Sequence, residues 1–261
     1  MKNIPLAILL FLTTSAFAQN NLSVGNSGKV WSAAYQQRAA EYKALCFQAY
    51  NIAKMRLDEA VRLHKKGKPL AVVTDIDETL LDNSPEGARA GYANEGFNNT
   101  KWQEWTARAV ADTVPGAAEF FKYAAKKHVT VFYITNRGEK ERAATLKNLQ
   151  LYDLPFADDA HLFLRDKVSS KETRRQIVLA RYNIVLLCGD NLPDFDVLYD
   201  NPKSEEGRAE VTHKLKAQFG KKYIVIPNPS YGDWENGLYD FRSKLTNGQK
   251  DSLIRAKVKT Q

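Results

Sequence analysis

The sequence predicts an α/β fold built around one mostly parallel β-sheet, and three observations lead to that prediction. Short apolar runs recur along the chain and are bounded by glycine, proline or polar residues. Stretches with helical spacing of apolar residues separate these runs. Polar and acidic side chains follow directly where several of the runs end. Alternating strands and helices are typical of a parallel sheet covered on both faces, which binds ligands at the carboxyl ends of its strands.

The elements are predicted in the following order. Apolar residues recur at helical spacing over 30–66, so one or two helices are expected before the sheet. The breaker Gly67-Lys68-Pro69 precedes a predicted strand at 70–73. The later apolar runs predict strands at 129–134, 161–164, 184–187 and 223–226, and the stretches between them predict helices at 116–126, 139–149 and 170–182.

The segment from residue 82 to about residue 115 interrupts this alternation. It is polar, contains glycine and carries Trp102 and Trp105. We expect it to be a mostly helical insertion that caps the ligand site. Residues 19–261 are expected to form a single domain with a helical segment at its amino end.

The first 18 residues have the pattern of a secretory signal peptide. Lys2 precedes an apolar stretch, which ends in the small-residue cleavage pattern Ala16-Phe17-Ala18. The apolar stretch is shorter than the roughly 20 residues that a membrane span needs. The residue directly after the predicted cleavage site, where a lipid would be attached to a cysteine, is Gln19. The expected protein is therefore periplasmic or secreted and has no transmembrane anchor.

The composition is that of a globular protein with a basic balance. Of 261 residues, 44% are hydrophobic and 26% are charged, and the formal net charge is +8. This charge favours small anionic ligands such as phosphate esters. The basic residues are dispersed, so no nucleic acid polymer is expected as a partner. Cys46 and Cys188 could pair in an oxidising compartment, but two buried free thiols are the favoured interpretation.

Two carboxylates follow the first predicted strand, in the string Thr74-Asp75-Ile76-Asp77. Strand alternation would direct Asp75 and Asp77 to one face. Burying a lone carboxylate costs several kcal/mol, and a bound cation would offset that cost. Acidic residues at strand ends also serve as caps and turns, so this pair needs support from elsewhere in the chain.

That support comes from the ends of two further strands. The string Thr135-Asn136-Arg137 follows the second predicted strand and offers a hydroxyl and a turn that can donate to a phosphate oxygen. Asp190 and Asp194 follow the fourth, at a spacing that lets both supply oxygen ligands to a hard cation such as Mg²⁺. Lys171 lies just inside the helix predicted at 170–182, where its ammonium could hold both a nucleophile and a phosphate.

Taken together, these strings resemble the four motifs of the haloacid dehalogenase (HAD) superfamily. The motifs stand here as Asp75-x-Asp77-x-Thr79, Thr135, Lys171 and Asp190-x-x-x-Asp194. From about Trp31 to Leu245, longer strings are similar to class C bacterial acid phosphatases, including lipoprotein 5′-nucleotidases. These strings begin at Asp77-Glu78-Thr79-Leu80-Leu81, at Gly189-Asp190-Asn191 and at Pro227-Asn228-Pro229. Gln19-Asn20 stands where lipid-anchored members have a cysteine, so outer-membrane anchoring is not expected.

The resemblance implies a Rossmann-like core and hydrolysis of phosphate monoesters through an aspartyl-phosphate intermediate. In this scheme Asp75 attacks phosphorus, and Asp77 acts first as acid and then as base. The Asp75 carboxylate, the Asp77 backbone carbonyl and Asp190 would hold Mg²⁺, with support from Asp194. Thr135 and Lys171 would bind the phosphate oxygens.

The resemblance also suggests which esters are preferred. Asn136 and Arg137 lie beside the phosphate residues in sequence and are expected to contact substrate. Trp102 and Tyr231 match positions that form an aromatic pair around a nucleobase, which implies nucleoside monophosphates as substrates. Both aromatic residues could equally be packing residues. A homodimer is suggested by the resemblance alone.

Other functions are compatible with this fold. Phosphonate hydrolysis, phosphomutase action and dehalogenation occur on it. Asp77 argues against dehalogenation, and the predicted signal peptide argues against a cytosolic mutase. A noncatalytic nucleotide-binding or storage protein is the alternative from another class, although a complete catalytic set without turnover has no physical reason.

Overall fold

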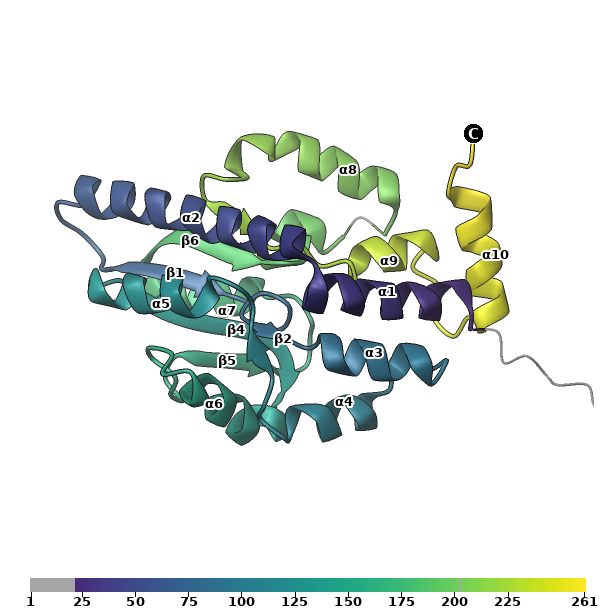
Figure 1. The fold of residues 1–261 in the computed structure, drawn as a ribbon. Helices are drawn as coiled ribbons and strands as arrows, with labels where there is room; N and C mark the ends of the chain where they lie inside the picture. The colour runs from purple at the N-terminus through teal and green to yellow at the C-terminus, as the bar shows by residue number, and fades with distance from the viewer. Residues whose placement is uncertain (1–21, 202) are drawn as a thin grey trace, which may run out of the picture.

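A five-stranded parallel sheet with the order β5-β4-β1-β6-β7 forms the centre of the protein (Figure 1). The structure is a computed structural model that describes residues 22–201 and 203–261. The signal peptide predicted at residues 1–18 lies outside the described residues. The strands are β1 (Leu70–Thr74), β4 (Thr130–Gly138), β5 (Leu162–Arg165), β6 (Asn183–Gly189) and β7 (Tyr223–Val225). The predicted α/β class with a parallel sheet is confirmed.

The central strand β1 is buried along its whole length and contributes to two cores. Leu70 and Val72 enter the larger core with helices α2 (Ala40–Leu63) and α5 (Ala117–Lys126). Ala71 and Val73 enter the smaller core, to which α7 (Glu172–Arg181) contributes Val178. Side chains of a strand alternate between its two faces, so a strand covered on both faces is apolar at every position.

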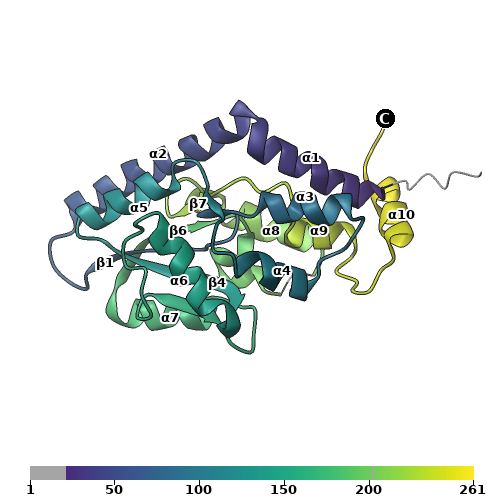
Figure 2. The same cartoon turned by 60° about the horizontal axis from the view of Figure 1, so that its bottom comes forward.

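Two helices precede the sheet and meet at a bend, which Figure 2 shows clearly. Helix α1 (Val24–Arg38) ends at Ala39, whose extended backbone separates it from α2. Helix α2 covers the sheet, whereas α1 projects beyond it and packs on α3 (Ser84–Tyr92). Among the described residues, no helix combines the length and the apolar character needed to cross a membrane.

The segment from residue 82 to residue 115 contributes helices near the carboxyl end of the sheet. It contains α3, α4 (Asn99–Thr106) and β3 (Asp112–Thr113), which pairs antiparallel with β2 (Leu81–Asp82). Helices α1, α3, α4 and α9 (Asp233–Leu238) gather beyond the strand ends (Figures 1 and 2). The remaining helices are α6 (Arg142–Leu151), α8 (Glu205–Lys214) and α10 (Asn247–Lys257), and short 3₁₀ turns join several elements.

One strand is longer than the sequence predicts. The strand predicted at 129–134 continues to Gly138, so Thr135, Asn136 and Arg137 lie within β4 and not in a turn after it. Gly138 still pairs with Arg165 of β5, after an irregularity in register that begins at Ile134. The prediction of a turn was wrong because it relied on the run of apolar residues, which ends at Ile134. The pairing between the backbones of β4 and β5 is found again at Gly138.

The two cysteines are buried and free, which confirms the favoured interpretation. Cys46 and Cys188 both belong to the larger core. Burial raises the pKa of the Cys46 thiol to about 11 and that of Cys188 further, because a thiolate is poorly solvated among apolar side chains.

Candidate active site

A cavity of about 560 Å³ opens at the carboxyl end of the sheet. Its wall contains residues from the ends of β1, β4 and β6, from the insertion, and from the loop that leads into α9. Of the site residues predicted from sequence, the cavity wall contains Asp75, Asp77, Trp102, Asn136, Arg137, Lys171, Asp190, Asp194 and Tyr231. The structure therefore brings together side chains that are up to 156 positions apart, from Asp75 to Tyr231.

Asp75 lies one residue beyond β1 and is held by backbone and side-chain contacts. Its backbone N–H donates to the carbonyl of Cys188 at 2.9 Å, which continues the pairing with β6. Lys171 Nζ lies 2.7 Å from Asp75 Oδ1 and 2.6 Å from Asp194 Oδ1. Lys171 is the N-cap of α7, one position before the helix begins, so the start of that helix places the ammonium between two carboxylates.

Asp190 and Asp194 follow β6 and are oriented by further hydrogen bonds. Asp190 accepts from the Thr79 hydroxyl at 2.9 Å and from Asn228 Nδ2 at 2.8 Å. Asp194 lies in the 3₁₀ turn Leu192–Asp194. A Cβ atom at Gly189 would lie 2.4 Å from the Cβ of Asp194, so glycine is needed there for the turn to approach the strand.

The three carboxylates fit a divalent cation. Asp75, Asp190 and Asp194 each offer an oxygen, and these oxygens lie within 4.8 Å of one another. Burial and the neighbouring carboxylates raise the pKa of Asp75 to about 7, although Lys171 opposes the shift, and burial raises the pKa of Asp190 well above its ordinary value. Lys171 pairs with two of these three carboxylates, Asp75 and Asp194. The cluster therefore needs further positive charge, and carboxylate oxygen is the ligand that hard cations prefer.

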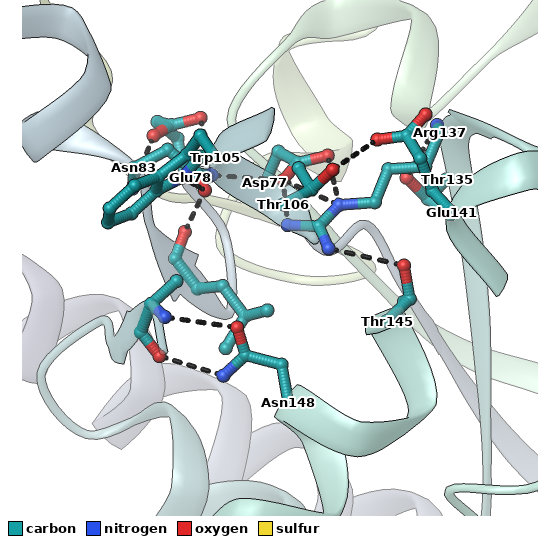
Figure 3. Close-up of polar contacts among 12 residues, drawn as sticks. Asp77, Glu78, Asn83, Trp105, Thr106, Thr135, Arg137, Glu141, Thr145 and Asn148 are labelled. Atoms are coloured by element: carbon teal, nitrogen blue, oxygen red, sulfur yellow. Dashed lines mark hydrogen bonds and ion pairs between the residues drawn. The ribbon is translucent and has the colours of Figure 1, made fainter. Parts of the chain in front are cut away.

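The Asp77 carboxylate pairs with Arg137 and not with this cluster. Arg137 Nη2 and Nε donate to Asp77 Oδ1 at 2.7 and 3.0 Å, and Nε also lies 3.2 Å from Oδ2. Only 1% of the Arg137 side chain is exposed, and its Nη1 donates to the Thr145 hydroxyl (Figure 3). The guanidinium predicted to contact substrate is therefore engaged by a carboxylate and a hydroxyl of the protein.

Thr135 and Asn136 occupy the end of β4 beside this pair. Thr135 is fully buried, is not part of the cavity wall, and accepts a hydrogen bond from the backbone N–H of Arg137 at 3.1 Å. The Thr135 hydroxyl oxygen is the acceptor in this contact, so the contact does not use the hydroxyl hydrogen. Asn136 Oδ1 accepts from Arg174 Nη2 at 2.9 Å, and Arg174 also donates to the Thr135 carbonyl. Arg174, which lies on α7, thus braces the end of β4.

Trp102 and Tyr231 approach the cavity from opposite parts of the sequence. Trp102 on α4 donates from Nε1 to Glu141 at 3.0 Å, and the Tyr231 hydroxyl donates to the buried carboxylate of Glu78. Glu141 also accepts from the backbone N–H of Gly138 at 2.8 Å, which ties α4 to the end of β4. Each aromatic ring is thus positioned by a buried carboxylate.

Several residues of the site were not predicted from sequence. Glu78 lies within the first motif, Asn83 lies two residues after Leu81, and Asn228 lies between two prolines. The local sequence does not indicate the hydrogen-bond partners of these residues. Glu141 and Arg174 carry no local signal at all, because their hydrogen-bond partners are brought near only by the tertiary fold.

A family model and two solved structures match most of this chain. Residues 13–234 match the family described as HAD superfamily, subfamily IIIB (acid phosphatase). Two structures of the class C acid phosphatase from Bacillus anthracis, one with tungstate bound, are each 38% identical with a TM-score of 0.86 and cover 91% of this chain and 99% of that chain.

Curated sequences show a weaker likeness. "Acid phosphatase 1" of Solanum lycopersicum is 28% identical over 167 residues, which is 61% of this chain and 57% of that protein. "Stem 28 kDa glycoprotein" of Glycine max is 26% identical over 168 residues, which is 61% of this chain and 62% of that protein. The chain thus spans less than two thirds of the length of these curated relatives.

Proposed function

The chain belongs to the HAD superfamily, subfamily IIIB, the acid phosphatases, and on that premise we propose that it hydrolyses phosphate monoesters through an aspartyl-phosphate intermediate on Asp75. One observation carries the proposal: Asp75 and Asp77, with separate cationic partners, lie in the wall of one cavity, and Asp75 belongs to a carboxylate cluster that fits a cation. The similar Bacillus anthracis protein binds tungstate, an oxyanion that resembles phosphate, which supports an anion site here.

In the first step, an Asp75 oxygen attacks phosphorus and a new O–P bond forms. The bond from phosphorus to the ester oxygen breaks, and its electron pair stays on the leaving oxygen. Asp77 donates its proton to that oxygen, so the alcohol leaves neutral and Asp77 becomes a carboxylate. Lys171 holds Asp75 in place and balances charge on the phosphoryl oxygens.

In the second step, water attacks the phosphorus of the intermediate. The water gives a proton to Asp77, the bond between phosphorus and Asp75 breaks, and inorganic phosphate forms. Asp75 is again a carboxylate and Asp77 is again protonated, so both residues are ready for another turnover. Thr135 is proposed to donate its hydroxyl hydrogen to a phosphoryl oxygen, and Asn136 to line the same position.

Mg²⁺ is the proposed cofactor. Asp75, Asp190 and the Asp77 backbone carbonyl would hold it, with Asp194 in support, and bound Mg²⁺ would neutralise charge on the phosphoryl group. Asp194 is already engaged by Lys171 and by the backbone N–H of Asn191, which suits a supporting position.

Nucleoside monophosphates are the proposed preferred esters. Trp102 and Tyr231 lie in the wall of the cavity that holds the carboxylates, and stacking between aromatic rings accepts any base. Tyr231 remains 38% exposed, so its ring is available for contact although its hydroxyl is bonded.

Export and self-association are further proposals that depend on sequence. The signal pattern at residues 1–18 supports a periplasmic or secreted protein, and the class C resemblance supports a homodimer. Residues 19–261 are proposed to act as one domain, with the segment from 82 to about 115 as the cap.

The test of the proposed activity is phosphate release from a nucleoside monophosphate and from p-nitrophenyl phosphate. We expect the wild-type protein to turn over both esters with Mg²⁺. In Asp75→Asn we expect the rate to fall by about 10³-fold or more, because no nucleophile remains. EDTA should abolish turnover, and added Mg²⁺ should restore it. Binding of nucleotide without release of phosphate would favour the noncatalytic alternative, and undiminished activity in Asp75→Asn would exclude the covalent route.

A further inference from the structure

The two oxygens of the Asp77 carboxylate have different surroundings. Oδ1 receives three donors: Arg137 Nη2 at 2.7 Å, Asn83 Nδ2 at 2.9 Å and Arg137 Nε at 3.0 Å. Oδ2 is contacted by Arg137 Nε at 3.2 Å. Among the described residues, every group that forms a hydrogen bond with Oδ1 is therefore a donor.

The amide orientation of Asn83 decides whether its contact is a donor. The two ends of an amide can exchange places at little steric cost, so a neighbour must determine which end faces Asp77. Trp105 Nε1, which can only donate, lies 2.8 Å from Asn83 Oδ1. The amide nitrogen is thus directed to Asp77, and it also lies 3.3 Å from Glu78 Oε2 (Figure 3).

The position of Asn83 is restricted as well as its orientation. The residue is only 3% exposed, and its backbone N–H donates to Glu78 Oε1 at 2.9 Å. Trp105 belongs to α4, in the segment between β2 and β3. The insertion therefore reaches the carboxylate of Asp77 through one tryptophan and one amide.

We propose that Asn83, oriented by Trp105, is a positioning residue that confines the transferable proton of Asp77 to Oδ2. A proton on Oδ1 would point at an amide N–H or a guanidinium N–H, neither of which can accept it. Oδ2 then gives the proton to the leaving oxygen and later takes one from water, in the two steps given above. This inference rests on the proposed function of Asp77. It adds that Oδ2 is the oxygen that transfers the proton and that Asn83 helps to select it.

This arrangement predicts a dependence on the leaving group. An alkoxide leaves poorly without a proton, whereas p-nitrophenolate leaves readily as an anion. A misplaced proton should therefore slow the cleavage of alkyl phosphates much more than that of p-nitrophenyl phosphate. The ratio kcat/KM is the suitable quantity, because it reports steps up to the release of the alcohol and excludes hydrolysis of the intermediate.

The experiment measures kcat/KM for p-nitrophenyl phosphate, phenyl phosphate and a simple alkyl phosphate. For Asn83→Ala we expect a loss of about 10- to 100-fold with the alkyl ester and less than about 3-fold with the p-nitrophenyl ester, since general acid catalysis contributes about 10²–10⁴ in all. For Trp105→Phe, which removes the donor to Asn83 Oδ1 and leaves the amide held only through its nitrogen, we expect a smaller change in the same direction.

Asn148→Ala is the matched control. Asn148 is also buried and makes two amide hydrogen bonds, to the backbone N–H and carbonyl of Ala111, but does not contact Asp77. Its loss should lower stability without changing the ratio of the activities on the three esters. If Asn83→Ala fails to fold, Trp105→Phe carries the test.

Asp77→Asn separates this inference from the proposed function. If Asp77→Asn does not increase the sensitivity of kcat/KM to the leaving group, Asp77 is not the acid and the proposed mechanism fails. If Asp77→Asn does so but folded Asn83→Ala and Trp105→Phe keep the wild-type sensitivity, the mechanism stands and the positioning role of Asn83 is overturned.

Discussion

Glu78 is a residue whose backbone and side chain both act at the site. Its φ of +57° lies in the left-handed region, which is costly for a residue with a Cβ atom. Its carboxylate is 1% exposed and accepts from the Tyr231 hydroxyl and the Asn83 backbone. Burial beside Asp77 raises the pKa of Glu78 well above its ordinary value. The turn after β1 thus supplies the two carboxylates proposed to be catalytic and also Glu78, the hydrogen-bond partner of Tyr231.

At the scale of single residues, the proposed stacking of a nucleobase on Trp102 and Tyr231 is tested by removing the two rings. In Trp102→Ala combined with Tyr231→Ala, we expect kcat/KM for a nucleoside monophosphate to fall about 10- to 100-fold relative to that for a small alkyl phosphate, since stacking contributes about 1–3 kcal/mol per base. Tyr231→Phe is the control, because it keeps the ring and removes only the contact with Glu78. An unchanged preference in the double variant would contradict base stacking.

At the scale of elements, α1 connects the amino end of the chain to the site. The Ser32 hydroxyl donates to the Pro229 carbonyl at 2.7 Å, and Gln36 accepts from the Ser230 hydroxyl at 2.7 Å. These contacts hold the loop that carries Asn228 and Tyr231. Helix α1 also packs closely on α3, so it joins the insertion to that loop.

The close approach of α1 and α3 depends on Gly91. A Cβ atom there would lie 2.7 Å from Val30 Cγ2 and 2.9 Å from the backbone oxygen of Asn26, which cannot move independently of α1. We expect Gly91→Ala to lower the free energy of unfolding by about 1–3 kcal/mol, as overpacking does. Urea denaturation followed by circular dichroism measures the change.

Gly28→Ala is the control for this prediction. Gly28 lies on α1, and a Cβ atom there would meet nothing within 4 Å. Replacing a helical glycine by alanine without a clash should raise the free energy of unfolding by about 0.4–1 kcal/mol. If the two substitutions change the free energy of unfolding equally, the close contact between α1 and α3 is not the reason that position 91 requires glycine.

At the scale of the whole molecule, the cavity combines segments from both ends of the described chain. Its wall extends in sequence from Lys29 on α1 to Asn236 on α9. The carboxylates in its wall also affect the stability of the entire fold. The pKa of Asp75 is about 7 instead of the usual 3.8. The metal-free folded protein therefore holds a proton that the unfolded chain releases, and its stability should fall as pH rises from about 4 to about 7.

Mg²⁺ should therefore stabilise the protein more at pH 7.5 than at pH 5. At a concentration 100 times its dissociation constant, a ligand adds about 2.7 kcal/mol, which corresponds to about 5–10 °C in Tm for a protein of this size. Calorimetry of the metal-free protein with and without Mg²⁺ measures the shift. Asp190→Asn should reduce it, and an equal shift in that variant or at both pH values would argue against this carboxylate cluster as the binding site.

The sequence by itself determined the order of strands and helices and the placement of the motif residues near strand ends. Strand burial and helical periodicity are local patterns, and they located β1, β5, β6 and β7 to within a few residues. Because the strands of a parallel sheet share one carboxyl edge, the pattern also indicated that Asp75 and Asp190 meet.

Only the tertiary structure decided the partners of those residues. The extension of β4 to Gly138 depends on pairing with β5, and the donation by Trp105 to Asn83 depends on how α4 packs. The separation of Asp77 from the Asp75 cluster depends on a buried Arg137 from another strand. Hydrogen bonds and ion pairs between distant segments leave no local pattern, because each partner is an ordinary polar residue until folding removes it from water.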